Sequence, residues 1–123
     1  MENYKNPALA PEERARDLLA RMTLQEKIGQ INITRGVEFH VNSLADGNTC
    51  SVEPDDTFMP EKFDEYVGDY GIGYLHDIYS IPAVKNRMQK KLVEGTRLGI
   101  PAIFTGEALH GIAYHGASIF PVP

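Results

Sequence analysis

A carboxylate and an imidazole lie three residues apart near the C-terminal end of the sequence. Glu107 and His110 stand in the segment Gly106-Glu107-Ala108-Leu109-His110-Gly111. An ionised carboxylate is a strong hydrogen-bond acceptor, and its oxygens can accept from two neighbouring hydroxyl groups of a sugar. Position alone leaves a second interpretation open for Glu107, in which it caps the following turn or pairs with a basic side chain.

His110 has three possible roles. It can orient Glu107, contact a substrate directly, or fill a buried polar niche with its ring bonded to backbone. A metal site would combine Glu107, His110 and His115. The three-residue spacing suits one face of a helix, but Gly106, Gly111 and Gly116 disfavour a helix here. We therefore take Glu107 and His110 as candidate substrate-binding residues and expect neither a metal nor a cofactor.

Two short apolar runs with a helical pattern between them are expected to position Glu107. Residues 71–75 and 102–105 are typical of buried strands, and Pro82 opens a helix that we expect to end at Gly99. A strand, a helix and a second strand predict parallel strands with a right-handed crossover. Ligands of parallel α/β folds gather at the carboxyl ends of the strands, where Glu107 would lie. The predicted fold class is α/β.

Helices are predicted ahead of this unit. Pro11 opens the first helix, and Thr23 with Glu26 forms a capping box, so a second helix begins at Leu24. A third short helix is predicted from Pro60 to about Asp69. The apolar residues of the first helix recur at helical spacing and predict a buried stripe. The residues of that stripe are Ala15, Leu18, Leu19 and Met22.

The remaining organisation is a division into three parts. A helical lead-in covers residues 11–33, an irregular loop rich in turn-forming residues covers 34–59, and the first βαβ portion covers 60–123. A loop of that length is uncommon in a compact domain unless it is functional or mobile. Together these parts are expected to make one partial domain, 1–123.

Composition excludes several classes of protein. The net charge of −5 disfavours a nonspecific nucleic-acid binder, which needs a basic face. Cys50 is the single cysteine, so no intramolecular disulfide is possible. We see no signal peptide and no apolar stretch of the ~20 residues that a membrane span needs. The expected location is cytoplasmic, or extracellular or periplasmic if the N-terminus is trimmed; the oligomeric state is left open.

Three groups of motifs, in order along the chain, resemble family 3 glycoside hydrolases of the β-glucosidase and β-xylosidase type. The first is Arg21-Met22-Thr23-Leu24-Gln25-Glu26-Lys27-Ile28-Gly29-Gln30, within opening helices that span Arg14 to Ile31, and the second is Gly71-Ile72-Gly73. The third group comprises Arg97-Leu98-Gly99-Ile100-Pro101, Phe104, Glu107-Ala108-Leu109-His110-Gly111 and Gly116-Ala117-Ser118-Ile119-Phe120-Pro121.

The resemblance implies the N-terminal part of a (β/α)8 barrel and a retaining hydrolase acting on β-linked glucosyl or xylosyl residues at non-reducing ends. The substrate would be a β-linked oligosaccharide or an aryl glycoside. In this family an acidic residue after a barrel strand binds hydroxyls of the terminal sugar, and it matches Glu107. Many β-glucosidases have aspartate there, so the sugar stays open. The nucleophile and the acid/base would lie beyond Pro123, and the 123 residues alone would be inactive.

Two alternatives from other classes remain. The chain could be a non-catalytic carbohydrate-binding module or a degenerate remnant of the family that keeps Glu107. It could instead be a structural or interaction protein that binds no sugar. A saccharide-induced thermal shift is expected for a hydrolase or a carbohydrate-binding module but not for a structural or interaction protein.

Overall fold

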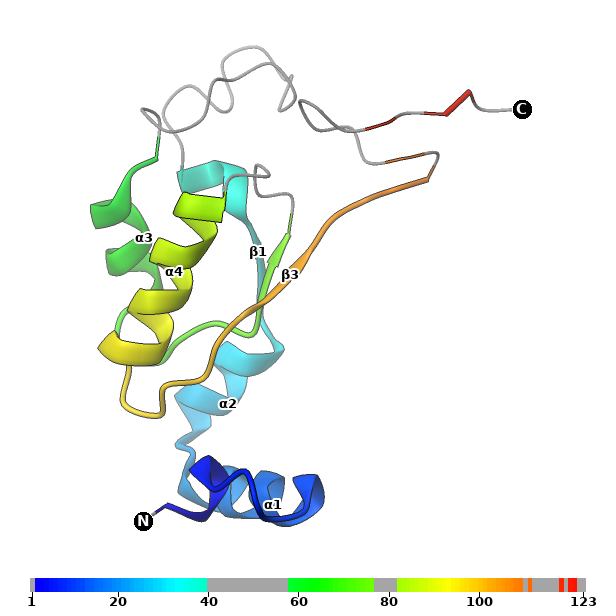
Figure 1. Cartoon of the computed structure of the whole chain (residues 1–123). Helices are drawn as coiled ribbons and strands as arrows, with labels where there is room; N and C mark the ends of the chain where they lie inside the picture. The colour runs from blue at the N-terminus through cyan, green and yellow to red at the C-terminus, as the bar shows by residue number, and fades with distance from the viewer. Residues whose placement is uncertain are drawn as a thin grey trace.

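A computed structural model describes residues 2–39, 58–76 and 82–109, together with positions 111, 118, 120 and 121. Figure 1 shows the helices and strands of this part of the chain. In chain order they are η1 (Asn3–Lys5), α1 (Pro11–Arg21), α2 (Leu24–Ile31), β1 (Ile33–Arg35), η2 (Gly36–Phe39), α3 (Pro60–Val67), β2 (Tyr74–His76), α4 (Pro82–Gly95) and β3 (Ile103–Thr105).

The three described strands form a parallel sheet in the order β1-β2-β3. The two predicted strands are confirmed, although β2 begins later than residue 71. β1 was not predicted, because Ile33–Arg35 is short and stands at the start of the segment taken for a loop. Of that predicted loop, residues 40–57, Cys50 among them, lie outside the described part of the chain.

The core lies between one face of this sheet and the helices α3 and α4, which stand together beside it (Figure 1). Leu75 in β2 is fully buried, and Met88 and Leu92 of α4 are fully buried against it. The Gln89 side chain joins α4 to the start of β3, because its amide donates to the Ala102 carbonyl at 2.7 Å and accepts from the Ala102 N–H at 3.0 Å.

A close backbone contact sets the register of β1 beside β2. The Gly73 N–H donates to the Gly29 carbonyl at 2.9 Å, and the Tyr74 N–H donates to the Asn32 carbonyl at 3.2 Å. A Cβ atom at position 73 would lie 1.9 Å from the Gln30 carbonyl oxygen. Only a residue without a side chain therefore lets the end of α2 lie this close to β2.

The helix starts are as predicted, and so is the capping box. Pro11 opens α1, and α2 begins at Leu24. The Glu26 N–H donates to Thr23 Oγ1 at 3.2 Å, while the Thr23 N–H donates to the Glu26 carboxylate at 2.8 Å. The end of α4 was predicted wrongly, because the helix stops at Gly95 rather than Gly99.

The prediction of a buried stripe on α1 is wrong. Leu19 is 56% exposed, and α1 holds no buried residue. The apolar residues of the stripe instead line one side of a hollow of about 570 Å³ between α1 and α2, together with Ile28 and Ile31. No element of the described chain covers this hollow. The helical spacing therefore predicted correctly that these residues share one face, but it did not predict whether that face is buried. Among the described helices, none is long and apolar enough to traverse a bilayer.

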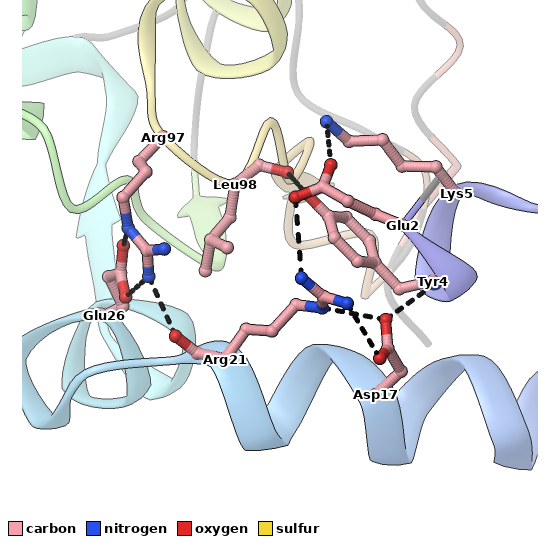
Figure 2. A network of polar contacts seen from close by, with 8 residues as sticks. All are labelled: Glu2, Tyr4, Lys5, Asp17, Arg21, Glu26, Arg97 and Leu98. Carbon is pink, nitrogen blue, oxygen red and sulfur yellow. Dashed lines mark hydrogen bonds and ion pairs between the residues drawn. The ribbon is translucent and has the colours of Figure 1, made fainter.

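An ion pair between the buried Glu26 and the exposed Arg97 joins the helical lead-in to the segment before β3. Glu26 is only 3% exposed. Its carboxylate accepts two hydrogen bonds from Arg97, at 2.8 Å from Nε and 2.6 Å from Nη2 (Figure 2). The Arg97 guanidinium, helped by the N–H and hydroxyl of Thr23, lowers the pKa of Glu26 to about 2.

A second group of polar contacts lies beside this pair in Figure 2. The Tyr4 hydroxyl donates to the Leu98 carbonyl at 3.0 Å, and the Tyr4 N–H donates to the Asp17 carboxylate at 3.0 Å. Arg97 also donates to the Arg21 carbonyl at 2.9 Å. The segment before β3 is therefore fixed to both η1 and the end of α1.

The ion pair predicts an acid-dependent loss of stability. Because folding lowers the pKa of Glu26, its contribution is complete above the unfolded-state pKa of about 4.5 and is lost as the pH falls toward about 2. Glu26→Gln should remove this contribution and flatten the dependence of unfolding free energy on pH between about 5 and 2. Urea unfolding at several pH values measures it, with exposed Glu12→Gln as a control for net charge. An unchanged slope in Glu26→Gln would contradict the assignment.

Candidate functional site

The sheet has one covered face and one open face, which we define as the face opposite α3 and α4. Leu75 and Phe104 point toward the helices, since the first is a core residue and the second packs against the core. Successive side chains of a strand alternate between faces, so the residues on either side of these two point to the open face. The open face is therefore where the sheet can present polar groups.

The strand register arranges the open face in two rows. Ile33, Tyr74 and Ile103 are neighbours nearer the amino ends of the strands. Arg35, His76 and Thr105 are neighbours at the carboxyl ends, and we call them the carboxyl row. The first row is largely apolar and the second is polar, so the carboxyl row is the part of the sheet suited to binding a polar ligand.

A hydrogen bond links two members of the carboxyl row. His76 Nδ1 lies 3.2 Å from Thr105 Oγ1, and both side chains are half-buried. Which of the two groups donates depends on the tautomer of the ring. The bond ties the last residue of β2 to the last residue of β3.

Glu107 follows the end of β3 by two residues, at the carboxyl end of the parallel sheet. Its side chain is exposed, and it makes no hydrogen bond or ion pair with any residue that the structure describes. Neither the turn cap nor the basic partner of the alternative interpretation is therefore found in the described part of the chain. A carboxylate in this position can accept hydrogen bonds from a ligand.

The other residues predicted around Glu107 are outside the description. His110 and His115 both fall in undescribed positions, so their predicted roles stay predictions. No group of three potential ligands that could hold a metal is found among the residues placed by the structure. Beyond Glu107, Leu109 and Gly111 form an isolated bridge, and Gly111 has a φ of 106°.

The sequence correctly predicted that Glu107 follows a strand, but it did not single out the carboxyl row. Arg35 was assigned to a loop, and His76 and Thr105 were not considered because neither belongs to a recognisable motif. The available signal was the alternation within the strands, since each of these residues follows one on the face that α3 and α4 cover. Using that signal required the boundaries of β1 and β2. β1 was not predicted, and β2 was predicted at 71–75 rather than at Tyr74–His76.

The motifs that carry the resemblance meet at the opposite end of the sheet from Glu107. Glu26 of the first motif pairs with Arg97 of the third, and Gly29 of the first contacts Gly73 of the second. These contacts position backbone segments ahead of β1, β2 and β3. These four motif residues therefore have structural contacts, while Glu107 is the one described motif residue with an exposed carboxylate beyond the end of a strand.

Comparison with curated proteins finds relatives that are named as a β-xylosidase or as β-glucosidases. The chain is 32% identical over 124 aligned positions to "Putative beta-xylosidase" from Formosa agariphila, a match that covers 99% of this chain and 16% of that protein. It is 32% identical over 110 positions to "Beta-glucosidase C" from Emericella nidulans, covering 87% of this chain and 16% of that protein. It is 28% identical over 116 positions to "Lysosomal beta glucosidase" from Dictyostelium discoideum, a match that covers 85% of this chain and 13% of that protein.

The chain thus spans about one sixth of the length of these relatives. No family model matches the sequence. The relatives nevertheless match most of the chain, and they are named as a β-xylosidase and β-glucosidases, the types of enzyme that its motifs resemble. On this evidence the chain is related to the family 3 glycoside hydrolases.

Proposed function

We propose that residues 1–123 are the N-terminal part of a (β/α)8 barrel in a retaining glycoside hydrolase. The enzyme would release β-linked glucosyl or xylosyl residues from non-reducing ends of oligosaccharides or aryl glycosides. The observation that carries the proposal is the exposed carboxylate of Glu107 just after the carboxyl end of β3, in a chain related to β-glucosidases and β-xylosidases. Ligands of barrel enzymes bind at that end of the strands.

The barrel is supported by the shape of the described sheet. All three strands are parallel, and the described helices α3 and α4 pack on a single face. In a closed barrel the other face becomes the interior, which is filled by layers of side chains from alternate strands. The row Ile33, Tyr74 and Ile103 would lie within this interior, and the carboxyl row would lie nearer the substrate. Ile33 and Ile103, each more than half exposed here, would be buried by closure.

In the proposed division of the chain, the helical lead-in at 11–33 closes one end of the barrel, and the portion at 60–123 contributes β2 and β3. β1 now belongs to the sheet as well, so the predicted loop at 34–59 begins with a strand. The chain would supply no catalytic carboxylate. One carboxyl group of a retaining glycosidase attacks the anomeric carbon, and a second protonates the leaving oxygen. We propose that both come from outside residues 1–123.

Glu107 would hold the sugar while those groups react. Its two carboxylate oxygens can accept from vicinal hydroxyls, and hydrogen bonds to a charged acceptor are stronger than neutral ones. Bonds of this kind orient the anomeric carbon and accelerate the reaction where they strengthen in the transition state. The match to relatives named for xylosides and for glucosides leaves both sugars in the proposal.

The first test is Glu107→Ala in the product of the complete open reading frame that encodes these residues. We expect a loss of about 1.5–3 kcal/mol in transition-state stabilisation, the value of a hydrogen bond to a charged group. Michaelis–Menten kinetics with aryl β-glucoside and aryl β-xyloside measure it as kcat/KM. Glu94→Ala removes an exposed carboxylate from α4 and serves as the matched control. Wild-type kinetics in Glu107→Ala would refute the substrate-binding role.

The second test uses the 123-residue chain alone. We expect no turnover of either aryl glycoside above the buffer rate, because the chain would lack both reacting carboxyl groups. Release of the aryl chromophore measures turnover, and Glu107→Ala in the same chain is the control for contaminating hydrolase. Turnover that is lost in this variant would show that the catalytic groups lie within residues 1–123.

A further inference from the structure

We infer that His76 and Thr105 are positioning residues for Glu107, acting through the hydrogen bond that joins the ends of β2 and β3. The inference rests on the proposed function, because it concerns how the proposed sugar-binding carboxylate is held. Neither residue belongs to the motifs that relate the chain to its family, so the pair is a property of the sheet geometry rather than of those motifs.

The position of Thr105 gives it control over the turn that follows. It is the last residue of β3, and only Gly106 separates it from Glu107. Glycine has no side chain to pack against the sheet and restrains the backbone least of all residues. Gly106 therefore adds no side-chain restraint, and Thr105 is the last residue of β3 that can anchor the chain ahead of Glu107.

The bond to His76 supplies this anchor. Thr105 pairs with His76 in the strand register, and its Oγ1 lies 3.2 Å from His76 Nδ1. Cross-strand side-chain pairs of this kind stabilise the local pairing of neighbouring strands. At the carboxyl end the regular hydrogen bonds of the sheet stop, and this side-chain bond holds the last residue of β3 against β2 there.

The described residues offer Glu107 no other restraint. Its carboxylate has no hydrogen-bond or ion-pair partner among them. Its placement against a sugar would therefore depend on the backbone behind it. Small displacements of a binding group reduce the rate of an enzyme sharply, because the reacting groups lose their alignment.

The test is a double-mutant cycle in the product of the complete open reading frame, with kcat and KM measured on both aryl glycosides. Thr105→Val removes the hydroxyl at nearly constant shape, and we expect kcat/KM to fall by about tenfold, the effect of one lost hydrogen bond. Thr105→Ser keeps the hydroxyl and should restore most of the activity. Thr96→Val, which removes a hydroxyl bonded to the Leu92 carbonyl at 2.6 Å, is the matched control and should leave the kinetics unchanged.

The double variant Thr105→Val with Glu107→Ala separates positioning from a general loss of structure. Residues that act through one another give non-additive effects, so the double variant should be no worse than Glu107→Ala alone. Fully additive losses, or wild-type kinetics in Thr105→Val, would overturn the inference while leaving the role of Glu107 intact. Wild-type kinetics in Glu107→Ala would instead refute the proposed function and this inference with it.

If Thr105→Val does not fold, the same comparison is made from the other strand. His76→Ala removes the partner of Thr105, whereas His76→Asn keeps a hydrogen-bonding group near the position of Nδ1. Lower kcat/KM in His76→Ala with recovery in His76→Asn supports the inference, and equal kinetics in the two variants overturns it.

Discussion

The contact between Gly73 and the end of α2 is the constraint on which the rest of the described structure depends. A Cβ atom at position 73 would lie 1.9 Å from a backbone oxygen of α2, so the glycine is required for the helix to reach the sheet. The contact leads the chain directly from α2 into β1 and aligns β1 with β2. The parallel register that follows then decides which side chains share a row.

A second constraint acts at the opposite edge of the sheet, on the segment that leads into β3. Arg97 is held by the buried Glu26, and the neighbouring Leu98 carbonyl is held by the Tyr4 hydroxyl. Both contacts fix the segment that enters β3. The lead-in helices therefore position the strands from their amino ends, which leaves the carboxyl ends free to carry Glu107. Under the proposed function, stability and binding would be separated along the strands, as in barrel enzymes generally.

The sequence predicted those features that depend on local chemistry. A capping box and a proline at the first turn specify a helix start by hydrogen bonding and fixed φ, and both starts were found at Pro11 and Leu24. Burial of the α1 stripe could not be predicted, because an apolar face shows only that a partner is favoured and not whether one is present. β1 was missed because three residues carry too little periodicity, and its strand identity comes from pairing with β2. The carboxyl row was missed for the same reason, since it exists only through the register.

The central claim is that Glu107 binds sugar hydroxyls from the carboxyl end of the sheet, and a crystal structure with a bound monosaccharide product tests it most directly. Crystals of the complete open reading frame product, soaked separately with glucose and xylose, would serve. The account predicts both Glu107 carboxylate oxygens within hydrogen-bond distance of adjacent hydroxyls, on the open face above the carboxyl row. A sugar seated elsewhere, or a Glu107 side chain turned away from it, would contradict the account.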